Sequence, residues 1–185
     1  MSDTGSQLAN IQTILGGKIL QSMQAQGDDV VMLERSGLRD SFQALRDQLN
    51  FDLLSDITAV DYWQKKTPRF EVVYQLVSLA SRRRLRLRVP VPDDDPAVDS
   101  LTPLWPGANF LEREVWDLYG IRFTGHPDLR RILLYDEFQG HPLRKDYPVN
   151  LCQPHVPERH VDGTFVDDRS RNKLLRLQKS LSTKR

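Results

Sequence analysis

The sequence predicts an α+β fold, in which a mixed, largely antiparallel sheet has helices packed on it and is followed by an extended C-terminal tail. Two segments, 70–77 and 84–91, alternate apolar and polar residues with the period of a strand. Segments with helical spacing lie before and after these strands rather than between them, which is typical of α+β domains. We therefore expect one domain over residues 1–148 and a polar tail over 149–185.

The first element is predicted to be an amphipathic helix over residues 7–25. Ile11 and Leu15 belong to an apolar stripe at helical spacing, Ser6 is the expected N-cap and Gly27 the expected stop. The next elements are expected to be a strand, a second helix and a second strand, at 30–33, 39–49 and 53–60.

The segment 84–91 has the most regular alternation in the chain. Apolar residues, beginning with Leu85 and Leu87, alternate with Arg84, Arg86 and Arg88. This pattern predicts an antiparallel strand with one buried face and an outward row of arginines. The row has two interpretations: it binds phosphate or acidic protein, or it is a solvated face that protects an edge strand from aggregation.

Residues 92–96 are rich in proline and aspartate and are expected to end the sheet. A short helix is expected over 97–104, where Pro103 and Pro106 would stop it.

A further helix is predicted from a local capping pattern. Asn109 is the expected N-cap, Glu112 occupies the capping-box position, and Gly120 is the expected left-handed stop. Inside this helix, Arg113 and Asp117 are expected to pair at i, i+4.

The tail lacks the periodicity of a strand. Apolar residues become sparse from Tyr147 onward, and residues 149–169 are expected to be extended and to gain order only against a partner or the domain. Residues 169–185 form a basic helix candidate.

Composition limits the possible functions. A formal net charge of +1 is too balanced for a protein that binds nucleic-acid backbones. No apolar run approaches the roughly 20 residues needed to cross a bilayer, and no export signal is visible. Because Cys152 is the only cysteine, the chain forms no internal disulfide and cannot supply the four thiolates that usually hold an iron–sulfur cluster.

Two side-chain groupings are candidates for chemistry. Cys152, His155 and His160, together with His141, have the residue types of a zinc site, although their spacing is unlike that of structural zinc motifs. The second grouping combines acidic side chains on the predicted helix with histidines, and acid–base catalysis is its functional interpretation. Because arginines lie nearby, an ion-pair network is the favoured interpretation. This grouping comprises Glu112, Glu114, Asp117, His126 and His141.

Residues 112–148 carry a dense series of motifs. Glu-Arg-Glu begins at 112, Trp-Asp at 116, Gly-His-Pro at 125, Leu-Arg-Arg-Ile-Leu at 129, and Gly-His-Pro-Leu-Arg-Lys-Asp-Tyr-Pro at 140. This series resembles the signature of the C subunit of bacterial NADH:quinone oxidoreductase, which is related to the thirty-kilodalton subunit of mitochondrial complex I. Asp61-Tyr62 and the segment 69–74 resemble the same family, and the resemblance extends over about residues 30–150.

The resemblance implies a cofactor-free structural subunit in the peripheral arm of a proton-pumping complex. FMN, iron–sulfur clusters and quinone would belong to partner subunits, chiefly the quinone-site subunit and the subunit with the terminal iron–sulfur cluster. The chain would be a peripheral protein at the cytoplasmic face of the inner membrane, with no contact to nucleic acid and no insertion into the bilayer. The expected interface set comprises Glu112, Arg113, Glu114, Asp117, His126, Arg130, Arg131, Arg144, Lys145 and Asp146.

Two alternatives remain open at this point. One is the equivalent subunit of a related hydrogenase or ferredoxin-linked complex, because relatives share the signature. The other is a stand-alone zinc enzyme that uses the His/Cys segment. The co-purifying subunits would decide the first, and metal analysis of the purified chain would decide the second.

Overall fold

A computed structural model describes residues 4–154, 158–159 and 165–166. These residues form two compact units. The first consists of the described residues up to 136 together with 140–149, and the second of 137–139 together with the described residues from 150 onward. The first unit contains all described helices and the main sheet. The predicted domain boundary after residue 148 stays a prediction.

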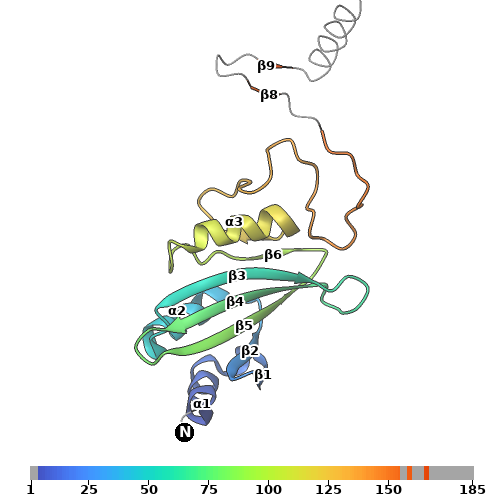
Figure 1. Ribbon diagram of the computed structural model, residues 1–185. Coiled ribbons are helices and arrows are strands. Elements are labelled where there is room, and N and C mark those ends of the chain that lie inside the picture. Colours follow the sequence, from blue (N-terminus) through green and yellow to red (C-terminus); the bar gives the residue numbers. More distant parts are fainter. Residues whose placement is uncertain (1–3, 155–157, 160–164, 167–185) are drawn as a thin grey trace, which may run out of the picture. The chain divides into compact units, whose positions relative to one another are not determined.

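The first unit is built on a five-stranded sheet with the order β1-β2-β5-β4-β3 (Figure 1). β2 runs parallel to β5, and all other neighbours are antiparallel. The predicted mixed, largely antiparallel sheet with helices packed on it is therefore confirmed. The strand bounds are β1 (Ile19–Ala25), β2 (Asp28–Leu33), β3 (Leu53–Asp61), β4 (Phe70–Ser78) and β5 (Arg83–Val91).

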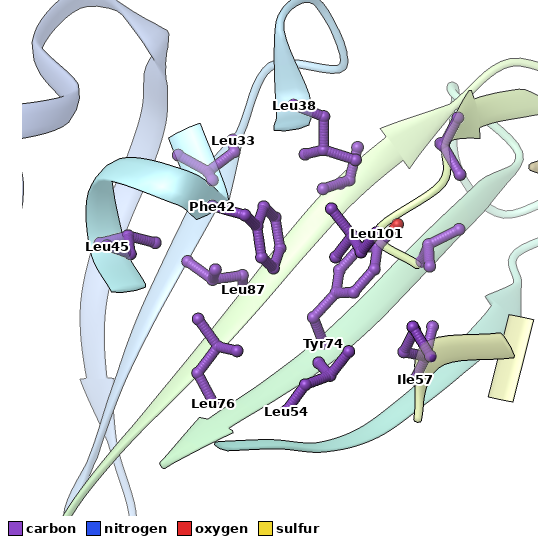
Figure 2. Close-up of a cluster of buried hydrophobic side chains, with 14 of the residues drawn as sticks. Leu33, Leu38, Phe42, Leu45, Leu54, Ile57, Tyr74, Leu76, Leu87 and Leu101 are labelled. Carbon is purple, nitrogen blue, oxygen red and sulfur yellow. The ribbon is translucent and has the colours of Figure 1, made fainter. Parts of the chain in front are cut away.

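Helix α2 (Leu38–Leu49) covers one face of this sheet and forms the core with it (Figure 2). Its Phe42 and Leu45 lie against Tyr74 of β4 and Leu87 of β5, and all four side chains are fully buried. The rings of Phe42 and Tyr74 meet edge to face with their centroids 4.8 Å apart. Each side chain of this size stabilises the fold by about 1.5–3 kcal/mol through burial.

The predicted helix over 7–25 is correct only in its first half. Helix α1 covers Thr4–Leu15, with the predicted N-cap Ser6 inside it, and a single 3₁₀ turn at Gly16–Lys18 follows. The first of the two glycines has a φ of +50°, in the left-handed region. Because a glycine costs about 1 kcal/mol relative to alanine in a helix interior, two in succession end the helix.

The second half of that segment is strand β1. A two-residue turn, Gln26-Gly27, joins β1 to β2, and both turn residues have positive φ, as a type I′ hairpin requires. Gly27 therefore closes a hairpin instead of stopping a helix. Met23, which widens the apolar stripe of the predicted helix, is exposed on β1, as is Leu20.

The short helix predicted over 97–104 is wrong. Residues Ala97–Asp99 form strand β6, which pairs in parallel with β7 (Arg122–Thr124). Val98 of β6 is buried and pairs with the buried Phe123 of β7. The pairing partner lies 25 residues further along the chain, so the local sequence around β6 does not reveal it.

Helix α3 (Ala108–Tyr119) follows β6 and packs along β3 (Figure 1). The predicted stop is confirmed, because Gly120 has a φ of +76° and donates its N–H to the carbonyl of Trp116. The predicted cap is wrong: Gly107 occupies the N-cap position, and no side chain caps the helix. None of the described helices has both the length and the apolar character that crossing a bilayer requires.

The arginine row on β5 does not protect an edge. β5 lies between β2 and β4, and both of its edges are hydrogen-bonded. The edge-protection interpretation is therefore wrong, and β5 is antiparallel to only one of its two neighbours.

The second unit contains a pair of hydrogen bonds between two glutamines and a short strand ladder. The side chain of Gln153 donates to the carbonyl of Gln139 and accepts from its N–H, at 3.1 and 2.8 Å. Glu158–Arg159 (β8) and Phe165–Val166 (β9) form a two-stranded antiparallel ladder within the segment expected to be extended. The basic helix expected over 169–185 lies outside the described residues.

Candidate functional site

One buried carboxylate joins the C-terminal half of α3 to the segment 131–134. Asp117 has no exposed surface. Its Oδ2 accepts hydrogen bonds from the backbone N–H groups of 132–134, at 3.1, 2.9 and 2.9 Å, and its Oδ1 accepts one from Arg131 at 2.7 Å. This single side chain therefore fixes the course of a four-residue segment beside the helix.

The Asp117 carboxylate stays ionised although it is buried. Burial alone would raise its pKa, but hydrogen bonds from the N–H of Leu134 and the guanidinium of Arg131, with those from Ile132 and Leu133, hold the pKa below the usual range. Local ion pairs of this type are strong because both charge and geometry match.

The predicted Arg113–Asp117 pair is wrong. Arg113 donates instead to the carbonyls of Arg130 and Arg131, at 3.0 and 2.9 Å. The helix thus binds the same segment twice, once through the acceptor Asp117 and once through the donor Arg113. Both side chains organise the segment from within the domain.

Gly120 allows a histidine to close against the end of α3. A Cβ atom at this position would lie 2.6 Å from Cδ2 of His141, so only glycine fits. His141 Nδ1 lies 2.9 Å from the carbonyl oxygen of Asp117, and the imidazole meets the Trp116 ring edge to face. Burial, together with the nearby cation of Arg131, lowers the pKa of His141, so the ring is neutral and donates from Nδ1.

Glu112 lies in the N-terminal half of α3 and is also fully buried. It accepts hydrogen bonds from the N–H of Leu101 at 2.6 Å and the hydroxyl of Ser100 at 2.7 Å, and so fixes the connection after β6. It does not act in a capping box. Burial raises its pKa to about 7, and the two neutral donors only partly offset this effect.

A second charged site, here named the Arg69 cluster, consists of Asp61, Arg69, Asp93, Arg144 and Asp146. The buried guanidinium of Arg69 donates to Asp61 at 2.9 and 2.8 Å, to Asp146 at 2.7 Å and to Asp93 at 3.1 Å. Arg144 donates to Asp93 at 2.9 Å. The cluster joins the end of the sheet to the 140–148 motif.

The charged groups of the Arg69 cluster are stabilised by contact with an aromatic ring and by their mutual ion pairs. The guanidinium groups of Arg69 and Arg144 lie 4.7 and 5.0 Å from the centroid of the Phe70 ring. The hydrogen bond from Arg69 lowers the pKa of Asp146. Burial would raise the pKa of Asp61, but hydrogen bonds from Arg69, Lys145 and Trp63 lower it overall.

Four members of the expected interface set are exposed, and three of them, unlike Asp146, lie outside the Arg69 cluster. The side chains of Glu114 and Lys145 are exposed and make no ion pair with a described residue, whereas Arg130 is exposed and pairs with Asp128 at 2.9 Å. The backbone N–H of Lys145 donates to Asp61. Large apolar side chains on the same helix and segment are also exposed, namely Phe110, Ile132, Leu133, Tyr135 and Leu143.

His126 is a structural residue in this arrangement. Its Nε2 lies 3.2 Å from the carbonyl oxygen of Asn109, and its Nδ1 accepts from the N–H of Asp128 at 3.0 Å. The imidazole therefore fastens the turn after β7 to the start of α3.

The described residues contain no group of three or more His, Cys, Asp or Glu side chains that would hold a metal ion. Cys152 is exposed, and His141 is bound to α3. The other two residues of the zinc hypothesis, His155 and His160, lie outside the described residues. That hypothesis stays untested.

The sequence alone did not point to Asp61, Arg69 and Asp93 as one site with Arg144 and Asp146. These residues are as much as 85 positions apart, and no local spacing connects them. Asp61 and Arg69 stood out only as part of the family resemblance. The 140–148 motif contains charged residues without an evident partner nearby in the sequence. That is the signal that could have prompted a search for distant partners.

Comparison with known proteins gives one consistent result. Residues 31–152 match the family described as the respiratory-chain NADH dehydrogenase 30 Kd subunit. The chain is 43% identical over 149 residues to the C subunit of the NADH-quinone oxidoreductase of Geobacter sulfurreducens, and the match covers 80% of this chain and 92% of that protein. The corresponding protein of Roseiflexus castenholzii is 46% identical over 169 residues, with 90% and 92% covered.

A solved structure shows the same fold. A trypsin-resistant fragment of Nqo5, residues 1–134, superimposes with a TM-score of 0.59 and 36% sequence identity. The match covers 68% of this chain and 98% of that fragment.

Proposed function

Because the chain belongs to the 30-kDa subunit family of respiratory-chain NADH dehydrogenase, we propose that it is the C subunit of an NADH-quinone oxidoreductase. In this role it carries no redox centre, and FMN, iron–sulfur clusters and quinone belong to partner subunits. It supports the quinone-site subunit and the subunit with the terminal iron–sulfur cluster. It lies in the peripheral arm, at the cytoplasmic face of the inner membrane.

The observation that carries this proposal is the segment ordered by Asp117. A surface held in place before binding loses less conformational entropy when a partner docks. Here a buried ion pair and three backbone hydrogen bonds hold a segment that presents Leu133, which is 60% exposed, while Glu114 on α3 and Arg130 just before the segment carry exposed charges. Exposed apolar and charged residues together are typical of protein interfaces.

We divide the expected interface set by the direction of its side chains. Glu114, Arg130 and Lys145 are exposed and would contact the partner directly. The other members would act by ordering the surface. Some bind the segment beside α3 or belong to the Arg69 cluster, and Glu112 and His126 fasten neighbouring loops to α3. Guanidinium and carboxylate groups at such junctions fix the register of the partners more than they add affinity. The ordering members are Glu112, Arg113, Asp117, His126, Arg131, Arg144 and Asp146.

The direct test reverses an exposed charge in cells that make the complex. Glu114→Arg and Lys145→Glu are expected to lower the amount of fully assembled enzyme several-fold on a native gel, while the purified chain keeps its unfolding midpoint. Glu34→Arg is the matched control, because Glu34 is exposed on another part of the chain. Its assembly should equal that of the wild type.

Two outcomes would revise the proposal. Full assembly in both test variants would remove these residues from the interface. Full assembly with slowed quinone reduction would instead assign them a direct electrostatic role. Identification of the subunits that co-purify from native membranes separates this complex from a hydrogenase or a ferredoxin-linked relative.

A further inference from the structure

The arginine row of β5 lies on the sheet face opposite α2. Arg84, Arg86 and Arg88 alternate with Leu85 and the other buried residues of the core. Because β5 is an inner strand, protection of an edge does not explain the row. Three arginines on adjacent positions of one face repel each other, so a sheet gains nothing from them unless anions face them.

This face is open in the described part of the chain. Across the β4–β5 ladder, Val77 pairs with Arg84, Gln75 with Arg86, and Val73 with Arg88. These β4 side chains keep part of their surface exposed, whereas Tyr74 and Leu76 on the opposite face have none. In Figure 1, α2 lies behind β3 and β4, and no described helix lies in front of them.

Positive charge gathers at one end of this face. At the other end, Arg88 is neutralised by Glu71, which is fully buried and also bonded to Lys66. Among the described residues, Arg86 pairs only with Asp28, at 3.6 Å. Arg84 is exposed and has no hydrogen bond or ion pair with a described residue.

A hollow marks the same place. It has a volume of about 310 Å³ and is lined by Arg84, Arg86, Asp28, Val77 and Gln75, among others. The surface therefore combines guanidinium groups with half-buried aliphatic side chains. Along β4 its lining begins at Gln75, five residues from Phe70, whose ring contacts the Arg69 cluster; this is about 17 Å at 3.3 Å per residue in a strand.

We propose that this face, defined by Val73, Gln75, Val77, Arg84 and Arg86, docks an acidic segment of another polypeptide. Carboxylates would take the two-pronged donors of Arg84 and Arg86, and apolar side chains of the segment would cover Val73 and Val77. This contact is separate from the interface set proposed above. It does not depend on which complex contains the chain.

The chemistry of the face selects a protein over other anions. β4 and β5 present no aromatic ring on this face for bases to stack on, which disfavours single-stranded nucleic acid. The half-buried Val73 and Val77 offer apolar surface that side chains of a protein segment can cover, whereas the phosphates of a lipid surface or a nucleic-acid backbone cannot. In a second copy related by two-fold symmetry, the same arginines would face each other, which opposes self-association through this face.

The experiment places a photoreactive benzoylphenylalanine at Gln75 in the full chain and irradiates intact cells. Mass spectrometry of denatured adducts should identify one predominant linked peptide with a net negative charge. Arg84→Glu combined with Arg86→Glu should lower the adduct yield about tenfold. Arg122→Glu is the matched control, since it reverses an exposed arginine on β7 and should leave the yield unchanged.

A charge-swap rescue shows whether the lower adduct yield comes from lost charge pairing and not from misfolding of the variant. Replacement of the acidic residues in the linked peptide by lysine should restore the yield with the doubly reversed chain. Absence of an adduct, an adduct with lipid, nucleic acid or a second copy, or a linked peptide that is neutral or basic would each overturn the proposal. Failure of the rescue would do the same.

Discussion

The two ends of α3 each bury a carboxylate, and the two carboxylates are shifted in opposite directions. Burial raises the pKa of Glu112 to about 7, whereas the pKa of Asp117 lies below its usual range. Both side chains have no exposed surface, so burial alone does not decide the charge. The donors decide it: Glu112 receives one N–H and one hydroxyl, and Asp117 receives three N–H groups and a guanidinium.

This difference gives the two buried carboxylates different structural roles. Asp117 is an anion that holds the 131–134 segment over the whole physiological pH range. Glu112 accepts hydrogen bonds from neutral donors in the connection after β6. The strength of this contact depends on whether Glu112 is protonated. The end of the helix that orders the proposed interface is therefore the end that stays charged.

The largest effect is expected from Asp117→Ala. The substitution leaves three N–H groups without their acceptor and removes an anionic partner of Arg131, whose side chain is only 14% exposed. Loss of one partner of a buried ion pair costs about 3–5 kcal/mol. Urea unfolding of the purified chain at pH 7 measures this loss, and amide hydrogen exchange at 132–134 should accelerate.

Glu114→Ala is the control for this variant, because Glu114 is an exposed acid on the same helix. Its free energy of unfolding should change by less than about 0.5 kcal/mol. A loss below about 1 kcal/mol in Asp117→Ala would mean that the carboxylate does not anchor the segment.

The next effect compares a glycine at each end of α3. Gly120→Ala combines a left-handed backbone with a Cβ atom 2.6 Å from His141. Strain and overpacking together should cost about 2–4 kcal/mol of unfolding free energy. Gly107→Ala is the matched variant, because Gly107 has a φ of −64° and nothing within 4 Å of the added Cβ. It should stay within about 0.5 kcal/mol of the wild type, and an equal loss in both variants would contradict the close approach of His141.

The sequence predicts those parts of the fold that a local pattern specifies. The alternation in β4 and β5 reflects one fully buried face, and the left-handed glycine after α3 follows from helix geometry. The error at β1 has a physical origin as well. Its apolar residues fit a helical stripe, but two glycines interrupt the helix before that stripe is complete.

The charged site was harder to predict because its partners are distant in the chain. Helical spacing predicts Arg113 as the partner of Asp117, but Arg131 is the residue that pairs with it. The segment of Arg131 is favoured because it also brings three N–H groups to the carboxylate. The Arg69 cluster likewise forms only when the sheet and the 140–148 motif meet. Local spacing identifies which residues carry charge, and tertiary structure decides which of them pair.

The smallest effect is a pH dependence that Glu112→Gln should remove. The folded chain holds the Glu112 proton more tightly than the unfolded chain, where the pKa is near 4.5. The contribution of Glu112 to wild-type stability should therefore decrease as pH rises from about 4.5 to about 7, by at most about 1.4 kcal/mol per pH unit. Glutamine keeps an acceptor for the Leu101 N–H and places its amide against the Ser100 hydroxyl, which can accept.

The free energy of unfolding of Glu112→Gln, relative to that of the wild type, should increase by about 1–3 kcal/mol between pH 5 and pH 8. Asp117 does not interfere, because the stability from its lowered pKa is lost only on acidification below its unfolded value of about 4. Glu114→Gln should show no such trend. Parallel curves for Glu112→Gln and wild type across this window would mean that Glu112 is ionised throughout, and the two ends of α3 would then not differ in the way their donors require.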